Sequence, residues 1–261
     1  MTIAGSDSGG GAGIQADLKT FAAFGVYGTS VITAITAQHT QSVERVIELS
    51  PDVVAAQIDA VARDIGADAV KTGMLANAAI VETVAEKIKE HKLPNLVVDP
   101  VMVAGSGGVL LRSEALDALV GKLLPLALVV TPNLYEAGVL TGRRLTNVED
   151  MRWAAKAISQ MGPQNVVVKG GHLEGKAVDV LWDGVEFHEF VAERIESTNT
   201  HGTGCTFASA IAACLTKGHT VTEAVSMAKE YVTQAIKESF PVGRGRTPLN
   251  HFYRFWGKDC F

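Results

Sequence analysis

The sequence predicts a layered α/β domain built on a mostly parallel sheet, because short apolar runs alternate with helical patterns along most of the chain. Five runs rich in β-branched residues end in polar, Gly or Pro residues and are expected to be buried strands, at residues 2–4, 70–72, 96–99, 128–131 and 166–169. Between them, apolar side chains recur at helical spacing, as at Val54, Ile58, Val61 and Ile65 and again through Val81, Val84 and Ile88. Helices with one apolar face are therefore expected to cover the sheet.

Two segments depart from this alternation. Residues 29–49 are strand-like on both sides of a polar stretch at 38–42, and residues 178–190 predict a hairpin around Asp183 and Gly184. Both segments are expected to be appendages of the alternating core.

Two capping boxes, Thr146-x-x-Glu149 and Thr220-x-x-Glu223, predict where two more helices begin. No linker rich in Pro or Ser and no internal repeat interrupts the chain. A single domain over residues 1–261 is therefore expected.

Composition narrows the class of partner. Of the 261 residues, 47% are hydrophobic and 20% charged, which is ordinary for a globular protein, and the net charge is −5. No extended cluster of Lys and Arg is present, so nucleic acid is not an expected partner and small molecules are. The three cysteines are odd in number and widely spaced, which fits neither a disulfide framework nor a zinc site. No apolar run approaches a membrane span, and the first Lys is Lys19, so a cytoplasmic protein is expected.

The carboxyl ends of the expected strands carry the residues best suited to chemistry. Ligands of open parallel sheets bind at that edge. The residues there are Gly5-Ser6-Asp7, Gly73-Met74, Asp99-Pro100, Thr131-Pro132-Asn133 and Lys169-Gly170-Gly171-His172. Each has an ordinary explanation as loop punctuation. Together they place an acid, a cation and flexible glycines at one rim, which favours a binding site.

A second candidate is the start of an alanine-rich helix. Gly202 and Gly204 precede the apolar run through Phe207, so consecutive backbone N–H groups can converge where the helix dipole adds positive potential. This arrangement predicts an anion cradle, although Thr203 as a simple helix cap remains an alternative. Cys205 lies in the first turn, where the N–H groups are expected to lower the pKa of its thiol, and is a candidate base or polar anchor.

The glycine-rich opening raises an alternative that the rest of the sequence disfavours. Gly11-x-Gly13-x-x-Ala16 satisfies a dinucleotide fingerprint, but Gln38 and His39 stand where that fingerprint needs an acid. A nicotinamide or flavin enzyme is therefore disfavoured. The Walker A signature is also absent from the sequence, so any nucleotide phosphate must be held differently.

Taken together, these segments resemble the hydroxymethylpyrimidine and phosphomethylpyrimidine kinases of thiamine biosynthesis, within the ribokinase-like superfamily. The matching motifs, in order, are at residues 3–21, 36–38, 71–75, 99–102, 131–133, 169–172 and 200–206. The resemblance extends to about His251. It departs at residues 245–248, where Thr247 precedes Pro248 although the family usually has glycine there. Pyridoxal kinases share several of these motifs, so a pyridoxal or pyridoxine kinase remains the alternative function.

The resemblance implies a three-layer α/β/α sandwich with a mostly parallel central sheet, of ribokinase type. It also implies ATP-dependent phosphorylation of 4-amino-5-hydroxymethyl-2-methylpyrimidine to its monophosphate and then to the diphosphate, with Mg²⁺, in a homodimer. The catalytic residues it implies are Cys205, Gly202, Thr203 and Gly204. Those implied around the pyrimidine are Gln38, Asp17, Gly5, Ala12, Met74 and Val101.

The resemblance assigns the ATP contacts to Lys169, Asn133 and Thr203, and the metal contacts to Glu136 and Asp99. From spacing alone, a solvated carboxylate on a helix explains Glu136 better than a metal contact does. Asp17 has a similar alternative, as a charge on a helix surface.

Overall fold

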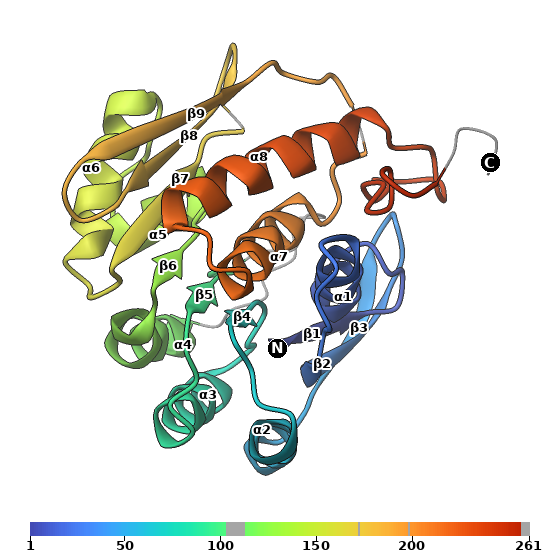
Figure 1. Cartoon of the computed structure of the whole chain (residues 1–261), viewed down its shortest axis with the longest axis vertical. Coiled ribbons are helices and arrows are strands. Elements are labelled where there is room, and N and C mark those ends of the chain that lie inside the picture. Colours follow the sequence, from blue (N-terminus) through green and yellow to red (C-terminus); the bar gives the residue numbers. More distant parts are fainter. Residues whose placement is uncertain (103–112, 172, 198, 257–261) are drawn as a thin grey trace.

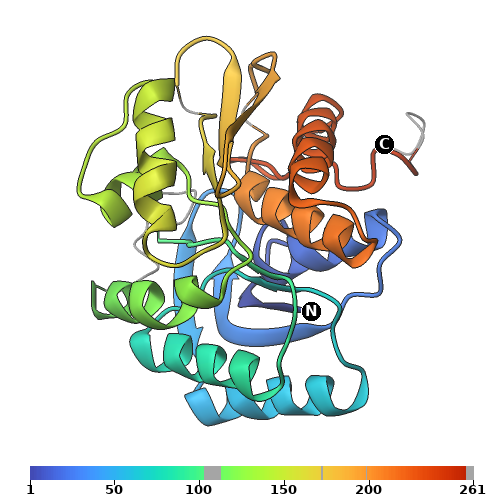
Figure 2. The same cartoon turned by 60° about the vertical axis from the view of Figure 1, so that its left-hand side comes forward.

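The structure, a computed structural model, describes residues 1–102, 113–171, 173–197 and 199–256. Its centre is a nine-stranded sheet in the order β3-β2-β1-β4-β5-β6-β7-β8-β9 (Figures 1 and 2). The parallel strands are β1 (Thr2–Asp7), β2 (Ser30–Gln38), β4 (Val70–Thr72), β5 (Leu96–Val98), β6 (Val129–Val130) and β7 (Asn165–Lys169). The five predicted strands are all present. The mostly parallel sheet is confirmed.

The sequence suggested that residues 29–49 and 178–190 are appendages, which is wrong. Strands from both segments extend the same sheet. Strand β3 (Val43–Glu48) pairs antiparallel with β2 at one edge. At the other edge, β8 (Ala177–Trp182) pairs antiparallel with β7, and β9 (Phe187–Ala192) with β8. The sheet therefore has antiparallel pairing at both edges of its six parallel strands.

Helices cover both faces of the sheet and complete the three predicted layers (Figures 1 and 2). One face carries α1 (Gly13–Ala23), α7 (Thr203–Thr216) and α8 (Val221–Lys237). The other carries α2 (Pro51–Asp64), α3 (Ala78–Glu90), α4 (Ser113–Ala118), the short turns Leu119–Leu123 and Leu124–Leu126, α5 (Leu134–Thr141) and α6 (Val148–Ser159). Within the described ranges, no helix has both the length and the apolar character needed to cross a membrane.

Each face of the sheet contributes to a separate apolar core. In β5, Val97 packs with α1, α7 and α8, whereas Leu96 and Val98 pack with the opposite layer. Neighbouring residues of a strand point to opposite faces, so a strand covered on both sides is apolar throughout. This explains why the buried strands appear in the sequence as continuous apolar runs.

The helix starts confirm one predicted capping box and correct the other. In α8, the Thr220 hydroxyl accepts from the Glu223 N–H while the Glu223 carboxylate accepts from the Thr220 N–H, as predicted. The box at Thr146 is wrong. Asn147 caps α6 by accepting from the Asp150 N–H at 2.9 Å, and the Thr146 hydroxyl donates to the Asp150 carboxylate. The helix therefore begins one residue later than the pattern suggested.

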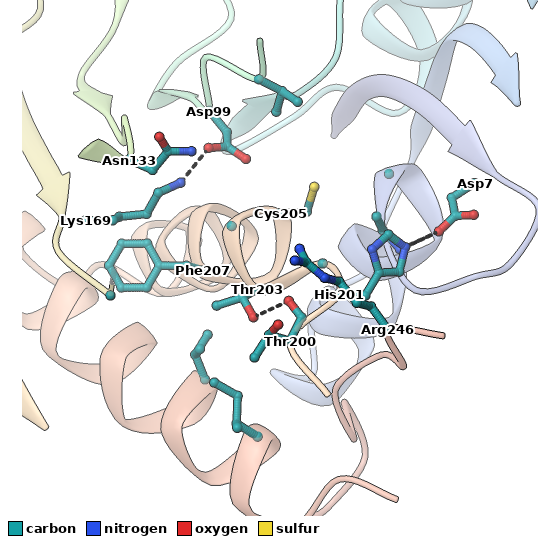
Figure 3. A pocket seen from close by; sticks show the side chains of 18 of the residues that line it. Asp7, Asp99, Asn133, Lys169, Thr200, His201, Thr203, Cys205, Phe207 and Arg246 are labelled. Carbon is teal, nitrogen blue, oxygen red and sulfur yellow. Dashed lines mark hydrogen bonds and ion pairs between the residues drawn. The ribbon is translucent and has the colours of Figure 1, made fainter. Parts of the chain in front are cut away.

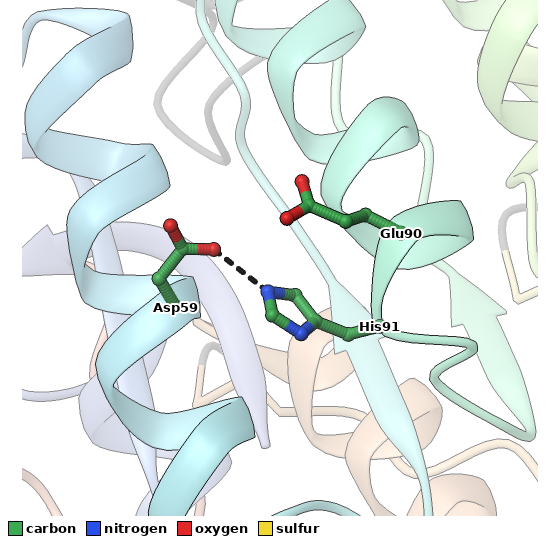
Figure 4. A group of neighbouring side chains, drawn as sticks. All are labelled: Asp59, Glu90 and His91. Atoms are coloured by element: carbon green, nitrogen blue, oxygen red, sulfur yellow. Dashed lines mark hydrogen bonds and ion pairs between the residues drawn. The ribbon is translucent and has the colours of Figure 1, made fainter.

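A surface cluster joins α2 to α3 (Figure 4). Asp59 of α2 lies 2.7 Å from the His91 ring nitrogen and 2.9 Å from the Lys87 ammonium, which also lies 2.8 Å from Glu90. The ligand atoms of the two carboxylates and the imidazole lie within 4.8 Å of one another, the spacing of a metal site. Because Lys87 already contacts both carboxylates, the cluster serves as an ionic contact between two helices.

Candidate active site

A cavity of about 700 Å³ lies at the carboxyl ends of the parallel strands, where the sequence predicted a site. It extends from the glycine-rich loop after β1 to the hairpin of β8 and β9. Of the site residues expected from the sequence, those that line it are Gly5, Ala12, Gln38, Met74, Asp99, Val101, Asn133, Glu136, Lys169, Gly202, Thr203, Gly204 and Cys205. Asp17 is the exception. The sheet therefore brings together residues that are up to two hundred positions apart in the chain.

The start of α7 forms the middle of the cavity wall. Gly202, the residue before the helix, has φ of 82°, and a Cβ there would lie 1.8 Å from the Gly11 carbonyl oxygen. Only glycine fits both the left-handed conformation and this close approach. Thr203 is not the cap, because its hydroxyl donates to the Thr200 carbonyl at 2.7 Å. The Thr203 N–H donates to the Thr200 carbonyl at 3.3 Å, and the Thr206 N–H donates to the Gly202 carbonyl, so the N–H groups of Gly204 and Cys205 are the ones that can face an anion.

The thiol of Cys205 lies between the two ends of the cavity, as Figure 3 shows. Its expected low pKa is wrong. Burial raises the pKa of Cys205 to about 11, and the nearby Lys71 ammonium offsets only part of this effect. The carboxylates of Asp17 and Asp99 add to the effect of burial, and a hydrogen bond from the Gly13 N–H opposes it. At neutral pH the group is therefore a protonated thiol, suited to orienting a hydroxyl rather than to acting as a preformed thiolate.

One end of the cavity carries opposite charges on β5 and β7, the two strands on either side of β6. Asp99 directly follows β5 and Lys169 ends β7, and their side chains lie 2.9 Å apart (Figure 3). Burial works against the Lys169 charge, but Asp99 and Glu136 raise its pKa above the ordinary value. A Cβ on Gly204 would lie 3.2 Å from the Lys169 ammonium. The cation and the helix start therefore face the same space.

Glu136 is buried, so the alternative of a solvated helix carboxylate is wrong. With Asn133 it forms a capping box at α5, in which each side chain accepts from the backbone N–H of the other. Burial raises the pKa of Glu136 to about 7; Lys169 opposes this and Asp99 adds to it.

The donor set at this end suits a hard divalent cation. Asp99 and Glu136 offer carboxylate oxygens, the ligands that Mg²⁺ prefers. Two buried carboxylates share the single ammonium of Lys169, so the cluster carries excess negative charge when both are ionised. A bound cation would relieve that charge.

The other end of the cavity, the apolar end, has an apolar wall but also holds His201 and Asp7 beside Gln38. Gly5, Ala12, Met74 and Val101 line it together with the Gln38 amide. A Cβ on Gly5 would lie 3.2 Å from the Met74 sulfur, so the methionine side chain packs directly over the glycine. This end fits a flat, mostly apolar ring with a hydrogen-bonding edge.

Comparison with known proteins agrees with this geometry. The family model described as phosphomethylpyrimidine kinase matches residues 7–250. The chain belongs to this family. It is 52% identical to the hydroxymethylpyrimidine/phosphomethylpyrimidine kinase of Rhizobium meliloti, over 98% of this chain and 97% of that protein. It is also 52% identical to the thiamine biosynthesis bifunctional protein ThiED of Geobacter sulfurreducens, but spans only 51% of that protein's length.

Solved structures of phosphomethylpyrimidine and pyridoxal kinases have the same fold. An ADP complex of Bacillus subtilis pyridoxal kinase superimposes with a TM-score of 0.90 at 47% identity, covering 96% of each chain. Phosphomethylpyrimidine kinase of Clostridium difficile gives a TM-score of 0.81 at 48% identity, covering 90% of this chain and 97% of that one. The fold is shared by both kinds of kinase, so the fold alone does not distinguish between them.

In this phosphomethylpyrimidine kinase family member, Asp17 does not lie on the pocket wall, and it is not a surface charge either. Its carboxylate is fully buried and lies 2.9 Å from the Lys71 ammonium. It also accepts hydrogen bonds from the hydroxyls of Thr2 and Ser209. Lys71 lines the cavity in its place. The sequence carried a signal for this lysine, because a charged residue inside a buried strand requires a partner.

The sequence analysis also gave no role to His201 or to the residues at the far end of the cavity. His201 lies beside Asp7, and Arg246 reaches the same region from the segment after α8 (Figure 3). Farther along, Arg194 donates to the Gly171 carbonyl and so connects the end of β9 to the loop after Lys169. Although His201 and Gly171 stood in recognised motifs, no local pattern indicated which segments they would meet.

Proposed function

We propose that this protein transfers the γ-phosphoryl group of ATP to the hydroxymethyl group of 4-amino-5-hydroxymethyl-2-methylpyrimidine, and then phosphorylates the resulting monophosphate. The observation that carries the proposal is the division of one cavity into a charged end and an apolar end with an amide, with the start of α7 between them. Membership of the phosphomethylpyrimidine kinase family supports the same chemistry.

ATP is assigned to the charged end. Lys169, Asn133 and Thr203 contact its phosphates, and the first-turn N–H groups of α7 stabilise charge on the moving phosphoryl group. Asp99 and Glu136 hold Mg²⁺, which neutralises polyphosphate charge when bound. The Cys205 thiol orients the acceptor hydroxyl for in-line attack. The ADP complex of the Bacillus subtilis relative supports nucleotide binding by a protein of this fold.

The pyrimidine is assigned to the apolar end. Met74 and Val101 pack against the ring and its methyl group, and Gly5 and Ala12 leave room for a flat ligand. Gln38 pairs with the amino group and a ring nitrogen, because a carboxamide offers both a donor and an acceptor.

Both phosphorylations are assigned to this one pocket, with the glycines at residues 9–11 giving room for the monophosphate. Variants of Cys205 and Lys169 are therefore expected to impair both steps. A variant remote from this rim that abolishes only the second step would indicate a separate site.

A pyridoxal kinase is the second candidate, favoured by the similarity to solved pyridoxal kinases. The deciding experiment measures ADP formation with the pyrimidine alcohol, its monophosphate and pyridoxal, for the wild type and Gln38→Met. The substitution keeps bulk but removes the hydrogen bonds, so kcat/KM for the pyrimidine should fall by about 10²-fold, with pyridoxal turnover unchanged or improved. An unchanged preference would favour the pyridoxal assignment.

A homodimer is proposed from the family resemblance. The exposed side chains of Ile35 and Ile47 lie opposite each other on β2 and β3, at an edge of the sheet, and support association there. Sedimentation of wild type and Ile47→Glu tests this assignment. A monomeric wild type would contradict it.

A further inference from the structure

The ring nitrogen Nε2 of His201 faces two side chains at once. It lies 3.0 Å from an Asp7 carboxylate oxygen and 3.3 Å from the Gln38 amide nitrogen. The His201 side chain is 14% exposed and the Asp7 side chain 3%, so solvent provides little alternative to these contacts. Whether Nε2 of His201 carries a hydrogen therefore determines how the Gln38 amide is oriented.

Asp7 is an acceptor in this contact. Its carboxylate accepts hydrogen bonds from the backbone N–H groups of Gly9, Gly11 and Ala12, in the loop that lines the pocket. Burial opposes its ionisation, but the hydrogen bonds from His201, Ala12 and Gly9 hold the pKa of Asp7 below its usual value. An ionised carboxylate has no hydrogen to donate, so Nε2 of His201 must carry one.

This assignment constrains the Gln38 amide. A nitrogen that bears a hydrogen in the ring plane has no lone pair with which to accept from the Gln38 NH₂ group, so two donors would face each other. Rotating the amide by half a turn places its oxygen at His201, where it shares the single Nε2 hydrogen with Asp7, and its nitrogen at the Thr36 hydroxyl, where the present contact is 3.2 Å. The Thr36 hydroxyl donates to the Ser6 carbonyl at 2.9 Å, so it accepts from the rotated amide.

We propose that His201 is a positioning residue that fixes the Gln38 amide with its oxygen toward the histidine and its nitrogen toward Thr36. One N–H and one lone pair of Gln38 then remain for a ligand in the cavity that Gln38 lines. This adjacent donor and acceptor match the ring nitrogen and amino group of an aminopyrimidine, whereas pyridoxal has no amino group to donate. The specificity part of this inference rests on the proposed function; the hydrogen-bond arrangement does not.

The first test is a double-mutant cycle between His201 and Gln38. His201→Phe keeps a ring but removes its hydrogen bonds, so it should raise KM for the aminopyrimidine about 10-fold, with KM for ATP unchanged. His201→Gln retains a donor and should keep most of the preference for the aminopyrimidine over pyridoxal. In a Gln38→Met background, His201→Phe should leave that preference unchanged. The surface substitution His219→Phe is the matched control.

Two results of the cycle would overturn the inference: an unaltered preference in His201→Phe, or an equal effect of that substitution with and without Gln38. The second test uses the wild-type protein without ligands and assigns the imidazole hydrogens by heteronuclear NMR. A hydrogen on Nε2 of His201 at pH 7 supports the arrangement, whereas an unprotonated Nε2 overturns it. Failure to phosphorylate any aminopyrimidine would contradict the proposed function while leaving the NMR result to decide the arrangement.

Discussion

Two aspartate and lysine pairs flank the start of α7, and they differ in how completely they are enclosed. Asp17 and Lys71 lie 2.9 Å apart with both side chains fully buried. Asp99 and Lys169 are also 2.9 Å apart, but the lysine side chain is 15% exposed and both residues line the cavity, whereas only Lys71 of the first pair does. The same chemical pair at the same distance therefore occurs once inside the framework and once at the surface of the site.

The partners of each pair explain the difference. Asp17 also accepts from the hydroxyls of Thr2 at 2.6 Å and Ser209 at 2.7 Å, so its carboxylate is well satisfied and cannot exchange partners without unfolding. Asp99 accepts from the Thr131 hydroxyl at 3.3 Å, a much weaker contact. Lys169 also lines the cavity, so its ammonium can contact a phosphate there while it stays beside Asp99. Burial distinguishes a pair that supports the fold from one that can act on a ligand.

The largest effect is expected at the enclosed pair. Lys71→Met leaves the Asp17 charge buried without its cation, which should lower the free energy of unfolding by about 3–5 kcal/mol. The double variant Lys71→Met with Asp17→Leu removes both charges and should recover much of that loss. Urea denaturation of the two variants checks this. Equal losses in the single and double variants would show that the pair is not the source of the effect.

At the open pair, the effect should fall on catalysis instead. Lys169→Met should lower kcat by about 10²–10³, because it removes a preorganised cation from the polyphosphate. Unfolding should be perturbed less than by Lys71→Met. Calorimetry without nucleotide should show unchanged binding of the pyrimidine alcohol. Loss of that binding would contradict the assignment of Lys169 to ATP.

Cys205 lies between the two pairs, and its replacement should have the next largest effect. Cys205→Ala should lower kcat by about 10². Cys205→Ser should retain more activity, because a hydroxyl also orients the acceptor. Since the pKa of the thiol is about 11, its thiolate absorbance should appear only well above neutral pH. Subtracting the absorbance of Cys205→Ser from that of the wild type measures it. A near-wild-type kcat in Cys205→Ala would contradict a role for the thiol in orienting the acceptor hydroxyl. The start of α7 would then act only by binding an anion through its N–H groups.

The contrast between the pairs also shows what the sequence could predict. Asp99 and Lys169 were predicted to share a rim because both follow parallel strands, whose carboxyl ends meet at one edge. The contact of Lys71 with Asp17 was not predicted, because it depends on β4 lying next to β1, which no local pattern specifies. The raised pKa of Cys205 was missed for a related reason. The helix start is visible in the sequence, but the burial that outweighs it comes from distant segments.

The last effect concerns only the pH dependence of stability and should come from Glu136, which shares Lys169 with Asp99. Its pKa is raised from 4.5 to about 7, so between those values the folded protein holds a proton that the unfolded chain releases. The free energy of unfolding should therefore fall as pH rises through this window, by about 3 kcal/mol at most. Glu136→Gln keeps the hydrogen bond to the Asn133 N–H but cannot ionise, so this decline should disappear from its urea denaturation between pH 5 and pH 8.

Glu223→Gln, in the exposed capping box of α8, is the matched control. The pKa of Glu223 is lowered by its hydrogen bonds to Thr220, so its stabilisation is present above the ordinary pKa and is lost as pH falls. Equal pH dependence of the free energy of unfolding in the wild type and Glu136→Gln would show that burial and the Asp99 carboxylate do not raise the pKa of Glu136.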